Sequence, residues 1–300
     1  MKIVAVIVTY YPAHGMLHEL VTSLVGQVDE IVVVDNGSDE KSIHQIEGCA
    51  SGLVSLIRLN ENAGVAVAQN RGIIFAKEVQ ADYVVLFDQD SQPEPEMVSR
   101  LLLVAEEKKS IGIPVAAVGP RYYDVRHNNP PPFIQTRKMR LNRQPCESAD
   151  AVVEVDYLVS SGCLIPLEAY DNVGAMEEQL FIDYIDIEWG LRAKRGGFRC
   201  FGVCGAGMRH VLGNTPIELL GHRFPCRPPL RHYYMFRNAV WMYRQGWVPA
   251  QWKVVDGWRL LVKYLFYTLF AHPRRHHFKM MSLGIWHGLR GRMGSHDASV

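Results

Sequence analysis

The sequence predicts an α/β fold, with a mostly parallel sheet covered by helices on both faces and a helical, basic C-terminal region after it. In the first half, short runs rich in Val and Ile alternate with stretches of helical periodicity, and the runs end on polar residues. In the last quarter, apolar residues recur along one helical face among many Lys and Arg. With 300 residues, 48% hydrophobic and 21% charged, the chain has the composition of a globular protein.

The alternation starts at the first residues. Residues 2–10 form a continuous apolar run, which is typical of a parallel strand covered on both faces, and residues 14–25 carry apolar side chains at helical spacing. The same order then repeats, with predicted strands at 30–35, 53–59 and 82–90 and a predicted helix at 65–79. Helices between successive strands indicate parallel pairing.

Polar residues stand where the predicted strands end. Thr9, Asp35 and Asp88 fall at carboxyl ends of strands, the edge at which such sheets bind ligands. In an extended segment residues two apart point the same way, so Asp88 and Asp90 are expected to present two carboxylates to one point while Gln89 faces elsewhere. Two hard oxygen ligands suit Mg²⁺ or Mn²⁺. The alternative is a solvated acidic turn before the next helix.

A second group of acids lies in the second half. After residues 122–145, which are rich in Pro, Asn and Arg and are expected to form a loop, Asp183, Asp186 and Glu188 surround Trp189. A helix is predicted over 185–194 and ends at a Gly-Gly pair. Either the acids only favour the start of this helix, or one of them accepts a proton in catalysis. If the helix begins early, spacing of three places Asp183 and Asp186 near one face and turns Glu188 away.

The cysteines indicate reduced thiols in a cytoplasmic protein, because they form no C-x-x-C pair and residues 1–10 lack the features of an export signal. They are Cys49, Cys146, Cys163, Cys200, Cys204 and Cys226. A zinc site at Cys200 and Cys204 is a weaker alternative to buried thiols, since no second pair is present. No apolar run is long enough for a membrane-spanning helix. No motif for nucleic-acid recognition accompanies the basic residues.

The C-terminal region differs from the rest in charge and pattern. Residues 253–292 hold eight Lys or Arg and one acid, Asp256, which gives a local charge of +7 against +1 for the chain. One helical face carries Trp258, Leu261, Val262, Leu265, Phe266, Leu269 and Phe270. This pattern favours a helix on an anionic membrane surface, with a core helix or a dimer contact as alternatives. Residues 227–245 are expected to form a helix that carries aromatic residues and Arg, with Arg231, His232 and Arg237 available to a phosphate.

Four segments, in this order, resemble glycosyltransferase family two with its GT-A fold, and most closely its bacterial rhamnosyltransferases. They are VAVIVTYYP, VDEIVVVDNGS, NENAGVAVAQNRGI and ADYVVLFDQDS. The resemblance extends from about residue 2 to residue 210. It implies inverting transfer of a sugar from a nucleotide diphosphate donor, assisted by Mg²⁺ or Mn²⁺. Asp35-Asn36 replaces the family's usual pair of acids, a variant that the rhamnosyltransferase branch shares.

The resemblance also implies roles for individual residues. The donor nucleotide is expected to contact Thr9, Tyr10, Asp35, Asn36, Asn62, Gly64, Asn70, Arg71, Asp88 and Gln89. The metal ligands are expected to be Asp88, Asp90 and His210. Alternatives remain open: Asp35 as the cap of the turn that follows it, Arg71 as a solvated helix residue, and His210 as a structural histidine.

Asp186 best matches the acid that serves as the family's catalytic base, with Asp183 and Glu188 as alternatives. The implied organisation is a GT-A catalytic domain over 1–225, with a donor half at 1–120 and an acceptor half at 121–225, followed by a basic helical region at 226–300.

The resemblance finally implies a substrate pair. The donor is expected to be dTDP-β-L-rhamnose, and the acceptor a saccharide or lipid-linked saccharide of lipopolysaccharide, O-antigen or another surface glycan. The expected location is the cytoplasmic face of the inner membrane, as a peripheral protein that binds no nucleic acid. Alternatives are a galactofuranosyl or hexosyl transferase, and a non-catalytic binder of nucleotide sugars; the retained acids at 88, 90 and 183–188 disfavour the last.

Overall fold

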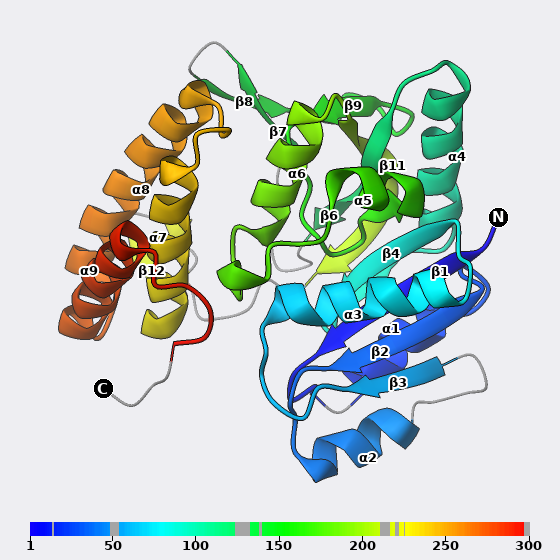
Figure 1. The fold of residues 1–300 in the computed structure, drawn as a ribbon, viewed down its shortest axis with the longest axis horizontal. Helices are drawn as coiled ribbons and strands as arrows, with labels where there is room; N and C mark the ends of the chain where they lie inside the picture. The colour runs from blue at the N-terminus through cyan, green and yellow to red at the C-terminus, as the bar shows by residue number, and fades with distance from the viewer. Residues whose placement is uncertain are drawn as a thin grey trace.

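The computed structural model describes residues 1–13, 15–48, 54–123, 133–137, 140–210, 217–219, 222–224 and 226–296. It confirms the predicted α/β class: a nine-stranded sheet runs β3-β2-β1-β4-β10-β6-β11-β5, with β9 paired to β11 (Figure 1). The strands are β1 (Ile3–Thr9), β2 (Glu30–Asp35), β3 (Val54–Arg58), β4 (Tyr83–Asp88), β5 (Ser91–Pro93), β6 (Val115–Tyr123), β9 (Val152–Val155), β10 (Leu164–Pro166) and β11 (Arg199–His210).

The sheet is parallel in its first half and mixed in its second. β1, β2, β3 and β4 pair in parallel, as the alternation predicts. β10 is antiparallel to both β4 and β6, while β6 and β11 are parallel. The short β10 therefore joins the parallel first half of the sheet to its second half, and the sequence did not predict it because three residues carry no readable periodicity.

Helices cover both faces of the sheet because alternate side chains of the strands point to opposite sides. On β1, Ile3, Ala5 and Ile7 belong to one apolar cluster, and Val4, Val6 and Val8 to another. The first cluster contains α1 (Met16–Leu24), α2 (Glu40–Gly48) and α4 (Met97–Ser110), and the second contains α3 (Val65–Glu78), α5 (Leu167–Val173) and α6 (Ile185–Arg195).

Close approach of α3 to β1 requires a glycine. A β-carbon at Gly72 would lie 2.2 Å from Val6 Cγ1, so any larger residue would push the helix off the strand. This contact packs the middle of α3 against the middle of β1.

Three helices follow the sheet: α7 (Pro229–Arg244), α8 (Ala250–Phe270) and α9 (Arg274–Arg290). Figure 1 shows them gathered beside α6, with α7 toward the sheet and α8 on the outside. Both α7 and α8 contribute buried side chains to the apolar cluster that contains residues of α3 and α6. These side chains are Phe236 and Met242 of α7 and Trp252 and Leu260 of α8. The C-terminal region thus shares a core with α3 and α6. Within the described residues, no helix is both long and apolar enough to cross a membrane.

Part of the predicted loop at 122–145 is a β-hairpin, which corrects that prediction. β7 (Phe133–Arg137) and β8 (Arg140–Gln144) pair antiparallel. The hairpin is held from outside: Thr136 N donates to Asp156 Oδ2 over 2.6 Å, and the Phe133 ring packs on Gly202. Two smaller strands, β12 (Ile217–Leu219) and β13 (His222–Phe224), form a second hairpin, and η1 (Glu178–Leu180) precedes α6.

The prediction that all cysteines are reduced thiols is wrong for one pair. Cys146 and Cys204 form a disulfide with a Cα–Cα distance of 5.6 Å. The two residues are 58 positions apart, so their spacing gave no sign of the pairing. A register irregularity between Val203 and Gly207 in β11 lies where Cys204 meets the segment after β8. Cys163 and Cys200 are free and buried, as expected, and Cys226 is free; Cys49 lies outside the described residues.

Candidate active site

The carboxyl ends of β1, β2 and β4 meet at one edge of the sheet. Thr9 lies in register with Asp35, and Val8 with Asp88. Polar residues predicted from three separate segments are therefore neighbours. The structure shows how each of them is bonded.

Asp35 caps the turn that follows β2. It is 1% exposed and accepts four hydrogen bonds: from Thr9 Oγ1 (3.1 Å), Ser38 Oγ (2.6 Å), Ser38 N (2.8 Å) and Gly37 N (3.1 Å). A carboxylate has about four acceptor positions, so these bonds occupy them all. The geometry favours the turn-cap alternative for Asp35, with Thr9 as its support.

A pair of amides ties this turn to the start of α3. Asn36 Nδ2 donates to Asn62 Oδ1 over 3.0 Å, and Asn36 Oδ1 accepts from Ala63 N over 2.9 Å. Gly64 has φ 97°, and the next amide, Val65 N, donates to Phe181 O over 2.7 Å. The start of α3 is thus docked on the segment before α6, and Asn36, Asn62 and Gly64 shape that junction.

Two tyrosines are exposed at the end of β1. The backbone of Tyr10 exchanges hydrogen bonds with the Gln89 amide, at 2.8 and 3.2 Å, which ties β1 to the end of β4. The rings of Tyr10 and Tyr11 meet edge to face at 4.8 Å and are 45% and 51% exposed. Exposed rings at a ligand edge can stack on a flat base. Sequence reasoning singled out Tyr10 and missed Tyr11, although the Tyr-Tyr pair was a visible signal.

Asn70 and Arg71 are neighbours in sequence with different surroundings. Asn70 is 3% exposed, and its amide bonds to Met176 O, Glu178 Oε1, Tyr170 Oη and Met176 N. These four bonds use its full capacity, so they leave no polar atom for a nucleotide. Arg71 is exposed on α3. Of the two, only Arg71 retains a side chain that can reach a diphosphate.

The turn after β4 is anchored by a serine that sequence reasoning missed. Asp88 N donates to Ser161 Oγ over 3.1 Å, and the hydroxyls of Ser161 and Ser91 are 2.6 Å apart. Ser161 is 2% exposed and precedes Gly162, whose amide donates to Leu86 O over 2.7 Å. The segment before β10 therefore fixes the direction in which Asp88 and Asp90 leave the strand.

His210 lies next to the same turn in the backbone. β5 pairs antiparallel with β11, and His210 is in register with Ser91, the residue after Asp90. The side chain of His210 lies outside the described part of the structure. Among the described side chains, no group of three or more His, Cys, Asp and Glu residues could hold a metal ion. Asp88 and Asp90 place two carboxylates at the end of β4.

Asp183, the first of the second group of acids, is engaged with two arginines. It accepts from Arg231 Nε (2.7 Å) and Nη2 (3.1 Å) and from Arg227 Nη1. Burial alone would raise the pKa of Asp183, but the two guanidinium groups outweigh burial and hold the pKa below its usual value. A carboxylate stabilised in this way is a poor proton acceptor. The expectation that Arg231 is available to a phosphate is not met, because it is paired here.

Glu188 is also engaged. Its two oxygens accept from Arg192 Nε and Nη2, each over 2.7 Å, and its side chain is 3% exposed. Burial raises the pKa of Glu188, although the Arg192 guanidinium opposes the shift. Arg192 also donates to the carbonyls of Val173 and Ala175, so the pair fixes the loop after α5.

Asp183 and Glu188 form ion pairs with arginines. Among the described residues, no such ion pair is found for Asp186. Burial raises the pKa of Asp186 to about 6, and the charges of Asp183 and Asp88 add to the shift, while the Ile187 amide opposes it with a 2.9 Å hydrogen bond. Asp88, which ends β4, is the smallest of these influences on the pKa of Asp186, which stands in the first turn of α6. Asp186 in turn raises the pKa values of Tyr122 and Tyr157, where burial is the larger cause. Those two tyrosines are further neighbours that the sequence did not reveal.

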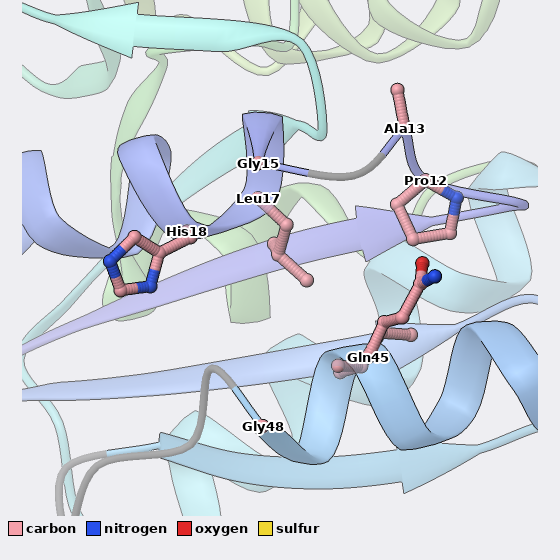
Figure 2. Close-up of a pocket in the computed structure, with 8 residues that line it drawn as sticks. Pro12, Ala13, Gly15, Leu17, His18, Gln45 and Gly48 are labelled. Atoms are coloured by element: carbon pink, nitrogen blue, oxygen red, sulfur yellow. The ribbon is translucent and has the colours of Figure 1, made fainter.

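A cavity of about 430 Å³ lies apart from these acids. Figure 2 shows it between the beginning of α1 and α2, with Pro12, Leu17, His18 and Gln45 among its lining residues. None of the acids lines it, so its shape does not define the candidate active site.

Comparison with known proteins decides the family. A family model described as Glycosyl transferase family 2 matches residues 5–155, about half of the chain. The chain belongs to glycosyl transferase family 2. It is therefore a glycosyltransferase, and the predicted resemblance is confirmed. The family match includes the ends of β1, β2 and β4 and extends to β9.

Relatives of this family 2 enzyme match most of its length. It is 32% identical over 252 residues to dTDP-rhamnosyl transferase RfbF of Shigella flexneri, covering 83% of this chain and 82% of that protein. It is 26% identical over 285 residues to galactofuranosyltransferase GlfT1 of Mycolicibacterium smegmatis, covering 87% and 90%.

Solved structures share the fold. A crystal structure of GalNAc-T7 with UDP, GalNAc and Mn²⁺ superposes with a TM-score of 0.61 at 15% identity, over 94% of this chain and 55% of that one. The family 2 enzyme thus spans about half the length of this structural neighbour. The structure of Staphylococcus aureus TarS residues 1–349 gives a TM-score of 0.53 at 14% identity, over 97% and 92%. At such identity the likeness concerns the fold alone and confirms the GT-A-like architecture.

Proposed function

We propose that this glycosyltransferase transfers L-rhamnose from dTDP-β-L-rhamnose to a saccharide acceptor, with inversion at the anomeric carbon. The observation that carries the mechanism is the place of Asp186 in the first turn of α6, beside two acids that arginines hold, Asp183 and Glu188, while desolvation raises the pKa of Asp186 to about 6. In this proposal residues 1–120 supply the donor side and residues 121–225 the acceptor side. The 32% identity to RfbF supports the proposed donor sugar.

Asp186 is the proposed general base. The acceptor hydroxyl gives its proton to the Asp186 carboxylate while its oxygen bonds to the anomeric carbon of the donor. On the opposite face, the bond from that carbon to the phosphate oxygen breaks, and the nucleotide diphosphate leaves with the bonding electrons. A base whose pKa lies near the working pH combines a useful fraction of carboxylate with real affinity for the proton.

A divalent metal ion fits the residues present. Asp88 and Asp90 offer carboxylate oxygens, the ligands that Mg²⁺ and Mn²⁺ prefer, and such ions take further oxygens from water and from substrate phosphates. The His210 backbone pairs in register with Ser91, the residue after Asp90, and this histidine is the proposed third ligand. When bound, the ion would neutralise charge on the leaving diphosphate. The Mn²⁺ named with the GalNAc-T7 structure supports this proposal.

A galactofuranosyl donor is the second candidate, favoured by the 26% identity to GlfT1 over 87% of this chain. Thermal unfolding in the presence of single nucleotide sugars tests the choice. dTDP-rhamnose with Mn²⁺ should raise the melting temperature more than UDP-galactofuranose or UDP-hexoses do, because ligand binding to the folded state alone stabilises it. Equal shifts for all donors, or the largest shift with UDP-galactofuranose, would remove dTDP-rhamnose from the proposal.

The proposal includes a membrane partner, because α8 and α9 expose large apolar side chains. These are Val254, Trp258, Leu261, Val262, Leu265, Leu269, Phe270, Phe278, Trp286 and Leu289, and they are between 40% and 67% exposed. α8 and α9 touch through a 2.8 Å hydrogen bond between Tyr264 and Ser282. We call this set the α8–α9 apolar surface. An exposed apolar surface of this kind marks an interaction site.

The charges around this surface fit an anionic membrane better than a protein partner. Residues 253–292 carry a charge of +7, and Arg274, Arg275, Lys279 and Arg290 are exposed on α9. Apolar side chains bordered by Lys and Arg are the pattern of helices that lie in the headgroup region of anionic lipids. In this proposal the protein binds the cytoplasmic face of the inner membrane peripherally, where a lipid-linked saccharide would be within reach.

Vesicle binding tests the membrane proposal. The wild-type protein should sediment with vesicles that contain phosphatidylglycerol and less with phosphatidylcholine vesicles, and Leu265→Glu should weaken the first interaction by about 10-fold because it buries a charge at the contact. Leu103→Glu is the matched control. Leu103 is 70% exposed, but it lies on α4 and not on α8 or α9. If the wild-type protein forms a dimer that Leu265→Glu dissociates, and the wild-type protein does not bind to vesicles, the surface contacts a second copy of the chain instead.

A further inference from the structure

We propose that Arg237 and Asn238, adjacent on α7, are positioning residues for Asp186. They hold residues 179–184, the segment that leads into α6, and so set the place of the base relative to Asp88. This inference rests on the proposed function, because it takes Asp186 as the base. Nothing in the sequence pointed to it: Arg237 was expected to be available to a phosphate, and the structure buries it completely.

The segment before α6 has a backbone that needs external support. Phe181, Asp183 and Tyr184 have φ values of 64°, 65° and 67°, the left-handed region that residues with a β-carbon rarely adopt. Each such residue costs roughly 1 kcal/mol or more and persists only where its surroundings determine it. Tyr184 is also the residue from which α6 starts, and no side chain caps that helix. The first turn of α6, which carries Asp186, therefore depends on what holds this segment.

The side-chain amide of Asn238 binds three backbone carbonyl groups of this segment. Its Nδ2 donates to Leu180 O (2.9 Å), Ile182 O (2.8 Å) and Asp183 O (2.9 Å), and the side chain is fully buried. Three acceptors converge on a nitrogen that carries two hydrogens, which requires a donor and excludes a carboxylate or an apolar side chain. The Asn238 oxygen accepts from Arg237 Nε over 3.0 Å, so the amide orientation is fixed as well.

Arg237 extends the same support. Its Nη2 donates to Leu180 O over 3.0 Å and to Gln179 O over 3.3 Å, and its Nη1 donates to Gly294 O. The guanidinium lies 4.8 Å from the centre of the Tyr234 ring, and burial lowers its pKa. A buried cation paired with carbonyl groups rather than an acid is costly. Its position suits a role in holding the carbonyls that face it.

The opposite side of the segment rests on the donor half. Val65 N, at the start of α3, donates to Phe181 O over 2.7 Å, and the Phe181 ring stacks on Tyr234 at 4.9 Å. The segment is thus held between α3, which belongs to the donor half, and α7. α9 supports α7 in turn, because Gly284 and Gly288 bring it against the backbone of Tyr233 and Arg237. The distance between the two groups of acids is therefore set partly by the C-terminal helices.

Asn238→Asp tests the proposal. The substitution keeps the shape and the acceptor for Arg237 but replaces the donor by a carboxylate oxygen that faces three carbonyl groups. We expect kcat to fall by about 10- to 100-fold with the KM for the donor nearly unchanged, because displacement of a catalytic group by about 1 Å costs that much. The acid limb of the pH–rate profile, expected near pH 6 from the pKa of Asp186, should also move.

Hydrogen exchange supplies a readout that needs no substrate. Backbone amides of residues 180–188 should exchange faster in Asn238→Asp, while those of β1 and β4 keep their protection. Asn172→Asp is the matched control: Asn172 is exposed and its amide donates to one carbonyl, Glu168 O, over 2.8 Å. This variant should match the wild type in rate and in exchange.

The outcomes separate three cases. A folded Asn238→Asp protein with wild-type kcat, pH profile and exchange at 180–188 would overturn the positioning role. If the variant loses protection everywhere, Asn238→Ser, which keeps one donor, decides: faster exchange confined to 180–188 supports the role, and uniform loss contradicts it. Absence of transfer by the wild type would count against the proposed function, while the exchange data would still report on the support of residues 179–184.

Discussion

Asp186→Asn is expected to lower the transfer rate by about 10²-fold or more while leaving donor affinity nearly unchanged. Asparagine keeps the shape and the acceptor for the Ile187 amide, but it cannot take a proton from the acceptor hydroxyl. The rate should be measured in single-turnover experiments, and donor affinity by nucleotide-sugar titration of thermal stability.

Two neighbouring acids provide the controls. Asp183→Asn should weaken its contacts with Arg227 and Arg231 and lower stability, and Glu188→Gln should loosen the loop that Arg192 fixes. Both are expected to reduce the rate less than Asp186→Asn does. A larger loss in Asp183→Asn would make Asp183 the base, and near-normal turnover in all three variants would leave these acids without a catalytic role.

The pKa of Asp186 connects its activity to stability. Burial raises this pKa from 3.8 to about 6, so between these values the folded protein binds more protons than the unfolded chain. Stability therefore falls as the pH rises from 4 through 6, and above pH 6 the buried carboxylate is a net cost. Asp186→Asn should remove this cost and raise the melting temperature at pH 7 to 8, in the same variant that loses transfer. The wild-type rate should fall as the pH drops below about 6.

The sequence predicted the parts of this fold that have local signatures. β1 to β4 are apolar strands of five to seven residues separated by helices, buried in β1, β2 and β4 and half-buried in β3, so their type and parallel pairing were readable. β10 has three residues and the β7–β8 hairpin is rich in Arg and Gln, so neither has the alternation that marks a strand. The Cys146–Cys204 disulfide depends on chain paths that only the folded sheet defines.

Sequence reasoning located the candidate site better than the contacts within it. The ends of β1, β2 and β4 could be placed because side-chain alternation and parallel pairing are regular. Whether a polar residue faces a ligand or the protein is decided by partners far away in the chain: Asn70 bonds to Met176, 106 residues later, and Arg231 to Asp183, 48 residues earlier. Burial of Arg237 was equally hidden, since its helix shows Arg and aromatic residues without a clear apolar face.

Asp90→Asn is expected to abolish metal-dependent donor binding and to lower turnover by about 10³-fold or more, since a metal that neutralises a leaving diphosphate contributes several kcal/mol. Asparagine retains the size of the side chain but removes one of the two charges that Asp88 and Asp90 present at the end of β4. Wild-type protein should be stabilised by dTDP with Mn²⁺ and much less by dTDP with EDTA, whereas Asp90→Asn should show the smaller shift in both conditions.

Asp82→Asn is the matched control, because Asp82 is an exposed acid at the other end of the same strand, where it accepts from Lys2 N over 2.7 Å. That variant should keep the metal dependence. Full activity of the wild-type protein in excess EDTA, or an undiminished Mn²⁺ effect in Asp90→Asn, would remove the metal from the proposed mechanism.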